Sequence, residues 1–261
     1  MKGGYFKAGR VHVSARVHEW SHAQVFVSGA VFNPGMVSIN VRNSEERALK
    51  NNLSSGDHSS ERMLNAALRS AGGVRPDAAI DRIQVIRENR TINVDLSRVM
   101  TGHSIPMLPL MNGDRIVVPS NDTLDPGLIK VSSITPPGIR VFLSNLTVPA
   151  AGNAESAIGK EASSLPYGSR LLTAAVSANC VGGANLTNAS RYVVLVRNDP
   201  FTGQEQVFQR PINKLLRNAH ENEINPHMMP NDSVACYDSG VTNIRDIARA
   251  TLEILAPYKL L

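Results

Sequence analysis

The chain carries an internal duplication, which constrains its fold more than any other feature of the sequence. Two glycine pairs, Gly72-Gly73 and Gly182-Gly183, each follow an amphipathic segment with helical periodicity. After each pair the pattern predicts a strand, a turn, a strand, a short helix and a last strand. The pairs lie 110 residues apart, and Asp114 and Asp232 of the two closing motifs lie 118 apart. In a chain of 261 residues this repeat predicts two domains of similar topology.

In the first copy, alternating apolar residues predict strands, and the turn Asn33-Pro34-Gly35 separates the first two. Leu64, Ala67, Leu68 and Ala71 recur at helical spacing, with Ser59 or Ser60 as the expected N-cap. The expected elements are strands at 24–29 and 36–41, a helix at 60–71, a hairpin at 83–95, a helical turn at 96–101 and a last strand at 115–118.

The second copy is expected to repeat this order after a linker at 121–137 that contains one short strand at 128–131. A long polar connection at 147–166 matches the polar segment at 43–59 of the first copy, which is expected to be a loop or short insertion. The expected elements are a strand at 139–145, a helix at 167–179, a hairpin at 192–196 and 205–208, a helix at 212–219 and a last strand at 233–237.

The tail at 241–256 is predicted to be an amphipathic helix. Asn243 can cap it, and Pro257 ends it. Two interpretations stay open: a helix packed on its own domain, or an assembly or membrane helix. About 14 residues rise only about 21 Å, short of the roughly 30 Å core of a bilayer, so this helix cannot span a membrane alone. The residues of the predicted assembly helix are Ile244, Ile247, Ala248, Leu252 and Leu255.

Composition argues against several classes of function. The net charge is +5, but no run of Lys or Arg exceeds two residues, and aromatic residues make up only 5% of the chain. Stacking platforms for single-stranded nucleic acid are therefore not expected. No apolar stretch reaches the length of a membrane helix, and residues 1–7 have no signal-peptide core. The alternating pattern at 11–17 predicts a strand without a partner, so we expect 1–22 to end a domain that lies before this chain.

No catalytic or metal-binding motif is found. The seven histidines are scattered, and the HExxH, GxSxG and P-loop patterns do not occur. We therefore expect no enzyme activity, cofactor or metal. Cys180 ends the second predicted helix, and Cys236 lies in the last strand. These elements are neighbours in a small domain of helices and strands, so a disulfide is one interpretation, and two unrelated buried thiols are the other.

Several motifs of the first copy resemble the SLBB (soluble-ligand-binding β-grasp) domain. They are 25–35, which reads VFVSGAVFNPG, then Ala71-Gly72-Gly73, Val94-Asp95-Leu96, and 110–119, which reads LMNGDRIVVP. The second copy keeps the glycine pair and the hairpin. It has Asn231-Asp232 in place of Gly-Asp, and no Pro-Gly follows its first strand.

Two such domains followed by an amphipathic helix resemble the outer-membrane polysaccharide export family. The resemblance implies an α+β fold: two tandem β-grasp-like domains at 23–120 and 138–240, then a C-terminal helix and tail at 241–261. It implies a ring-shaped homo-oligomer on the periplasmic side of the bacterial outer membrane. Such a ring exports capsular polysaccharide or exopolysaccharide with an inner-membrane copolymerase. The alternative is a periplasmic polysaccharide-binding or scaffold protein that forms no pore and passes polymer to a separate outer-membrane barrel.

Overall fold

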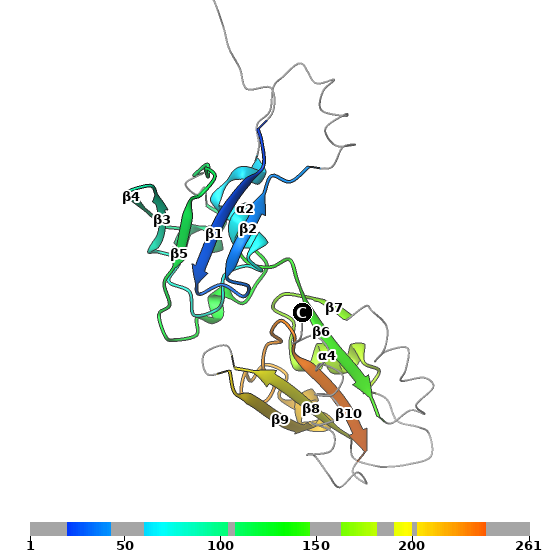
Figure 1. Ribbon diagram of the computed structural model, residues 1–261. Helices are drawn as coiled ribbons and strands as arrows, with labels where there is room; N and C mark the ends of the chain where they lie inside the picture. The colour runs from blue at the N-terminus through cyan, green and yellow to red at the C-terminus, as the bar shows by residue number, and fades with distance from the viewer. Residues whose placement is uncertain are drawn as a thin grey trace, which may run out of the picture. The chain divides into compact units, whose positions relative to one another are not determined.

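The computed structural model describes residues 20–42, 60–103, 108–146, 163–181, 191–199 and 203–238 (Figure 1). Within these residues the fold is α+β, with two five-stranded mixed sheets and three short α-helices. The chain divides into two compact units, Met1–Val74 with Ala78–Asn121, and Arg75–Asp77 with Asp122–Leu261. Each unit contains one sheet.

The sheet of the first unit has the strand order β2-β1-β5-β3-β4. Its strands are β1 (Ala23–Gly29), β2 (Gly35–Ile39), β3 (Ile83–Arg87), β4 (Arg90–Val94) and β5 (Arg115–Val118). β1 and β5 pair in parallel, whereas the other neighbours pair antiparallel. Alternate residues of β1, namely Ala23, Val25 and Val27, are buried, which confirms the predicted period of two.

The helix of this unit is shorter than predicted because the chain at its start is extended. A 3₁₀ turn η1 (Ser60–Arg62) precedes α2 (Leu64–Ser70), and Met63 between them forms a bridge with Pro109. Met63 occupies the N-cap position without a side-chain hydrogen bond, so the predicted serine cap is wrong. The predicted C-terminal stop is confirmed, because Gly72 and Gly73 have φ angles of 77° and 86°. The helical turn at 96–101 is the 3₁₀ helix η2 (Ser97–Thr101).

The second unit repeats the topology, with the order β7-β6-β10-β8-β9. Its strands are β6 (Gly138–Asn145), β7 (Ser163–Pro166), β8 (Arg191–Asn198), β9 (Glu205–Pro211) and β10 (Ser233–Asp238). Its helices are α4 (Leu171–Ser177) and α5 (Ile212–Arg217). The order of pairing is that of the first sheet, so the predicted duplication extends to the way the strands are connected.

Hydrogen bonds outside the regular elements repeat as well. The Phe26 amide donates to the Asp114 carbonyl at 2.9 Å, and the Phe142 amide donates to the Asp232 carbonyl at 2.9 Å. The turns before β5 and β10 both hold a residue in the left-handed region, Gly113 at φ 87° and Asn231 at φ 67°. Asn is the residue after Gly that tolerates this conformation best, so Asn231-Asp232 builds the same turn as Gly113-Asp114.

One correspondence in the predicted repeat is wrong. We expected Gly182-Gly183 to end the second helix, but the left-handed residue after α4 is Asn179, at φ 60°. The Asn179 amide donates to Val176, as the Gly72 amide donates to Arg69. Asn179 and Cys180 therefore hold the positions of Gly72 and Gly73. The pair Gly182-Gly183 lies outside the described residues.

Three further predictions need correction. The strand expected at 128–131 is wrong, because η3 (Pro126–Leu128) is a 3₁₀ turn capped by the Asp125 carboxylate. The last part of the connection at 147–166 is the strand β7, which pairs with β6. The second helix begins at Leu171 rather than at Tyr167, since Gly168 has a φ of 97° and bends the chain before it.

Some predictions fall outside the described residues. These are the strand at 11–17, the polar segment at 43–59 and the tail helix at 241–256. In the part of the chain that is described, no helix is long and apolar enough to cross a membrane.

We expect substitutions at Asn231 to follow the rules of a left-handed position. A β-branched side chain costs about 1–2 kcal/mol there, so Asn231→Val should lower the free energy of unfolding by this amount, and Asn231→Gly should cost less. Urea unfolding of the two variants measures the difference, and the matched pair Gly113→Val and Gly113→Asn tests the first unit. Equal midpoints for Asn231→Val and Asn231→Gly would contradict the assignment.

Candidate functional site

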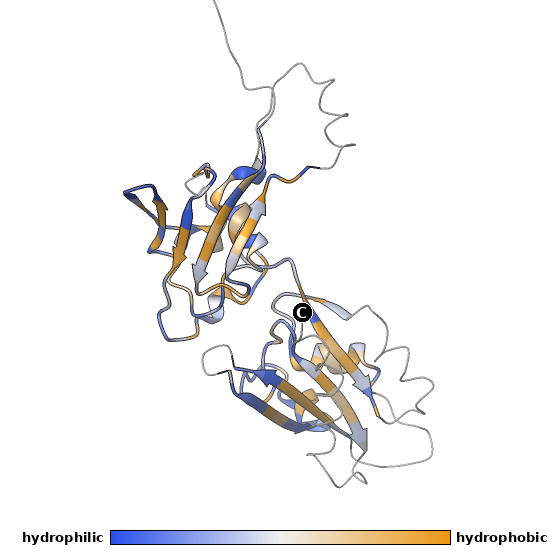
Figure 2. Ribbon diagram, in the orientation of Figure 1, coloured by the Kyte–Doolittle hydropathy of each residue, from blue (hydrophilic) through white to orange (hydrophobic). Residues whose placement is uncertain are grey.

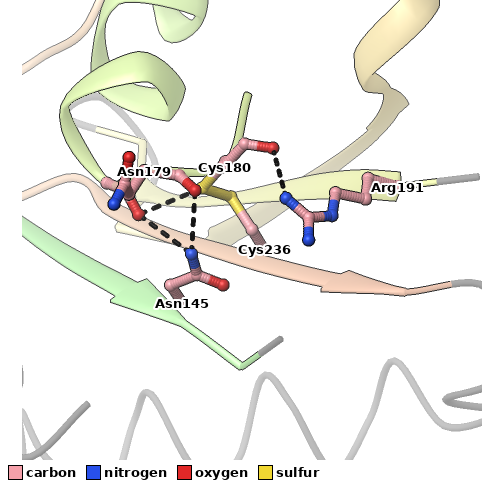
Figure 3. Close-up of a disulfide and its surroundings, with 6 residues drawn as sticks. Asn145, Asn179, Cys180, Arg191 and Cys236 are labelled. Carbon is pink, nitrogen blue, oxygen red and sulfur yellow. Dashed lines mark hydrogen bonds between the residues drawn. A yellow bond between two sulfur atoms is a disulfide. The ribbon is translucent and has the colours of Figure 1, made fainter. Parts of the chain in front are cut away.

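Cys180 and Cys236 form a disulfide in the structure. The sequence left open whether they form this bond or are two unrelated buried thiols. Their Cα atoms are 5.9 Å apart, and 56 positions separate them in the sequence. The bond joins the residue behind α4 to the central strand β10, and both residues are fully buried (Figure 3). It therefore fixes the C-terminal end of α4 on one face of the second sheet.

Polar groups around the disulfide hold the same helix end (Figure 3). The Asn145 side-chain amide, at the end of β6, donates to the carbonyls of Ala178 and Asn179 at 3.2 and 3.0 Å. The Arg191 guanidinium donates to the Cys180 carbonyl at 3.4 Å. Orphan carbonyls at the end of α4 thus receive side-chain donors from two strands.

The first unit anchors its helix with main-chain groups instead. The Asn33 amide donates to the Ala71 carbonyl at 2.9 Å, and the Phe32 amide donates to the Gly73 carbonyl at 3.1 Å. Both donors lie in the turn that ends in Pro34-Gly35, a sequence that does not follow the first strand of the second copy. In the second unit the disulfide and the Asn145 amide hold the corresponding end of the helix.

Each unit buries one ion pair between its hairpin and the turn before its last strand. Arg87 Nε and Nη2 donate to the two oxygens of Asp114 at 3.0 and 2.8 Å. Arg197 donates to Asp232 in the same way, at 2.9 and 2.6 Å. Both aspartate side chains are only 1% exposed. The two-bond geometry makes these the strongest polar contacts of the sheets.

The rest of each pair's surroundings is also duplicated. The second carboxylate oxygen accepts from the main-chain amide three residues earlier, that of Met111 or Met229, at 2.8 or 2.7 Å. Each guanidinium also donates to a carbonyl, that of Pro109 or His227.

These contacts and burial shift the pKa values of Arg87 and Asp232. Hydrogen bonding to Asp114 raises the pKa of Arg87. Burial raises the pKa of Asp232, and the hydrogen bonds from Arg197 act against it. Every carboxylate oxygen in the two pairs already accepts hydrogen bonds from the protein, so the pairs have the character of structural anchors.

A third buried pair belongs to the second unit. Arg75 Nε and Nη2 donate to the Asp77 carboxylate at 2.8 and 2.6 Å, and Asp77 is 1% exposed. The Pro76 carbonyl between them accepts from the Asp125 amide at 2.8 Å. These bonds explain why Arg75–Asp77 groups with Asp122–Leu261 rather than with its neighbours in the sequence.

The sequence predicted no metal site, cofactor or enzyme activity, and these expectations stay predictions. No group of three or more His, Cys, Asp or Glu side chains there could hold a metal ion. Burial lowers the pKa of His227 below its ordinary value. The predicted assembly-helix residues lie outside the described residues, so their contacts are not part of the site: Ile244, Ile247, Ala248, Leu252 and Leu255.

The sequence motifs did not predict the two buried Arg–Asp pairs. Asp114 and Asp232 were recognised only as parts of the closing motif, and their partners lie 27 and 35 residues earlier. A signal existed, because an arginine follows the apolar run of the first hairpin strand in both copies.

A scan against protein-family models and a search of curated proteins found no match to this chain.

We expect the disulfide to carry much of the stability of the second unit. In the chain-entropy treatment a loop of this size is worth about 4 kcal/mol, so the double variant Cys180→Ala/Cys236→Ala should lose about that amount in urea unfolding. The reduced wild-type chain serves as its control and should unfold with the variant. Full reaction of both thiols with a thiol reagent in the unreduced folded chain would contradict the bond.

Stability should also depend on the protonation of His227. Its Nδ1 donates to the Gly168 carbonyl at 3.0 Å, and burial holds its pKa below the ordinary value of 6.5. As the pH falls, the unfolded chain therefore binds this proton first. The contribution to stability is full above about pH 6.5 and is lost as the pH falls through the folded pKa.

The test compares thermal unfolding between pH 7.5 and 5. The wild-type chain should lose more stability over this range than His227→Gln, whereas His220→Gln, which alters an exposed histidine, should behave as wild type. Parallel pH profiles for wild type and His227→Gln would contradict the assignment.

Proposed function

We propose that this chain is a component of an outer-membrane and periplasmic channel that exports capsular polysaccharide or exopolysaccharide. In this proposal its two units are tandem β-grasp-like SLBB domains, and the chain acts in a ring-shaped homo-oligomer. The observation that carries the proposal is the duplicated topology, in which both sheets have the same strand order and the same hydrogen bonds around their closing turns.

The residues behind the family resemblance have geometric roles in the first unit, which supports its use. Gly29 has a φ of 89°, and a Cβ atom there would lie 2.0 Å from the Val118 carbonyl oxygen. Gly72 is similarly restricted, since a Cβ atom would lie 2.6 Å from the Asn33 side chain. Asp114 receives the buried Arg87. The motif residues thus form the connections that hold β1, α2 and β5 together.

The disulfide supports the compartment that we propose. Structural disulfides persist in oxidising compartments such as the bacterial periplasm. A buried bond that fixes α4 to β10 suits a protein that folds there. The partners in this proposal are other copies of the chain, the polysaccharide, an inner-membrane copolymerase and the outer membrane. Transport through a ring needs no catalysis, so we propose no enzyme activity.

Ring assembly requires contact surfaces on each copy, and the first sheet offers one. Phe26 and Met36 are directly opposite each other on β1 and β2, and they are 50% and 58% exposed. Exposed apolar neighbours of this kind are typical of surfaces that another molecule covers. We propose that this pair lies in the contact between copies. Closed rings need two different faces per copy, and two domains supply them.

Electron-microscope imaging of the protein purified in mild detergent tests the proposal. We expect closed rings with a central lumen. Phe26→Asp/Met36→Asp should break the rings, whereas Gln24→Asp/Ser38→Asp, the next cross-strand pair on the same face, should leave them intact. Monomers or dimers of the wild-type protein at micromolar concentration would contradict the channel. That result would favour the polysaccharide-binding or scaffold protein that forms no pore.

A further inference from the structure

The chain just before β1 is held in place by two side chains of the first unit. The Asn40 side-chain amide donates to the carbonyls of Trp20 and Ser21 at 2.8 and 3.1 Å. The Arg62 guanidinium donates through Nη1 to the Ser21 carbonyl at 2.9 Å and through Nε to the Leu110 carbonyl at 3.0 Å. Asn40 is buried, so the backbone at Trp20 has a defined position beside the sheet.

Trp20 and Arg62 form a stacked pair at this place. The Arg62 Cζ atom lies 5.1 Å from the centre of the Trp20 ring, within the range of a cation–π contact. Two hydrogen bonds to main-chain carbonyls fix the guanidinium. Trp20 is nevertheless 40% exposed, and it is the one tryptophan of the chain. The pair therefore presents an accessible aromatic surface next to a fixed cation.

The charge of Arg62 is not neutralised within the described part of the chain. Arg75, Arg87 and Arg197 each donate to a buried aspartate. Arg62 donates to carbonyls instead, and among the described residues its Nη2 atom makes no hydrogen bond and the adjacent Glu61 forms no ion pair with it. The turn η1 that carries Arg62 is hydrophilic, whereas the middle of β1 is apolar (Figure 2). This guanidinium thus has a donor available for an oxyanion.

The second unit does not repeat the pair. Ser169 takes the place of Arg62, since each carbonyl accepts a main-chain bond from the segment before the closing turn, at 2.8 and 2.9 Å. Pro136 takes the place of Trp20, because both lie six residues before the matching phenylalanine of the first strand. The duplicated fold forms without the ring and the guanidinium, so their role is specific to the first unit.

A ligand that fits this pair needs a flat apolar face with a negative charge beside it. Aromatic rings pack against flat apolar surfaces, and a guanidinium binds carboxylates. A uronic acid unit of a saccharide offers both, because C–H groups line one face of its pyranose ring and the carboxylate projects from the rim. We propose that Trp20 and Arg62 bind a uronic acid unit of an anionic polysaccharide, with the sugar ring on the indole and the carboxylate on Nη2.

The choice of a saccharide rests on the proposed function, whereas the choice of an anionic one rests on Arg62. Nucleic acids also combine flat rings with negative charge. Single strands need several stacking side chains, however, and aromatic residues make up only 5% of this chain. One ring and one donor per copy give a weak contact, which suits a polymer that has to move on after it binds.

Fluorescence of the single tryptophan tests the proposal directly. Titration of the intact chain with a short oligogalacturonate should change the emission of Trp20 to saturation. The methyl ester of the same oligosaccharide keeps the sugar rings but carries no charge. It should bind about tenfold more weakly, the order expected for the loss of one charge-assisted hydrogen bond. Equal affinities for the two compounds, or no change in emission with either, would overturn the proposal.

Variants separate this site from general attraction between charges. Arg62→Gln should lower the affinity for the oligogalacturonate about tenfold and leave the affinity for the ester unchanged. Arg69→Gln removes an exposed positive charge from the adjoining helix α2 and should bind both compounds as wild type does. If Arg62→Gln does not fold, the comparison of acid and ester on the wild-type chain still decides.

Two results would overturn the proposal in favour of attraction to any polyanion. One is an equal loss of affinity in Arg62→Gln and Arg69→Gln. The other is a change in Trp20 emission with a single-stranded oligonucleotide that equals the change with the oligogalacturonate.

Electron-microscope imaging of the same samples keeps this test distinct from the test of the proposed function. Closed rings without binding of the oligogalacturonate would overturn the site and leave the channel standing. Binding without rings would support the site and favour the polysaccharide-binding protein that forms no pore.

Discussion

Both sheets depend on a buried arginine–aspartate pair that fixes the turn before the last strand. The last strand is central in each sheet and pairs in parallel with the first strand, so its position decides the register of its neighbours. In each unit the aspartate carbonyl accepts the first hydrogen bond of this parallel pairing, from Phe26 or Phe142. Its carboxylate is held by an arginine near the end of the neighbouring strand, β3 or β8. A buried carboxylate without that partner is costly, so the turn and the hairpin must form together.

The second unit shows how the same frame is built with different chemistry. Asn231 adopts the left-handed turn that Gly113 adopts in the first unit, and Asn179 replaces Gly72 behind the helix. The compact turn at Asn33-Pro34-Gly35 holds the end of the helix in the first unit with main-chain donors. In the second unit the disulfide and the Asn145 amide hold the corresponding end. Main-chain geometry is thus exchanged for side-chain bonds, while the strand order stays the same.

The sequence predicted the strands well because their apolar residues alternate, and this pattern depends on local geometry alone. It predicted the helices less well, since Met63 and Gly168 extend or bend the chain where periodicity alone continues the helix. Glycine was taken as the sign of a helix end, and this placed the second end at Gly182-Gly183 instead of Asn179. β7 was missed because its four residues, SSLP, have little strand character and form a strand only against β6.

The candidate site was harder to predict because it depends on contacts between distant residues. The disulfide could be expected, since both cysteines fall on elements that the repeat brings together. The Arg–Asp pairs could not, because the spacing of 27 and 35 residues differs between the copies with the hairpin and loop lengths.

The difference between the two outer faces bears on how the copies have specialised. In the first sheet, the face away from the helix carries the exposed Arg115 and the half-buried Gln84 beside the exposed Phe26. In the second sheet, Val194, Ala235 and Tyr237 occupy that face and are buried. A polar residue at any one of these positions would then be buried without a partner, which is costly. The second unit therefore tolerates fewer polar substitutions on this face than the first.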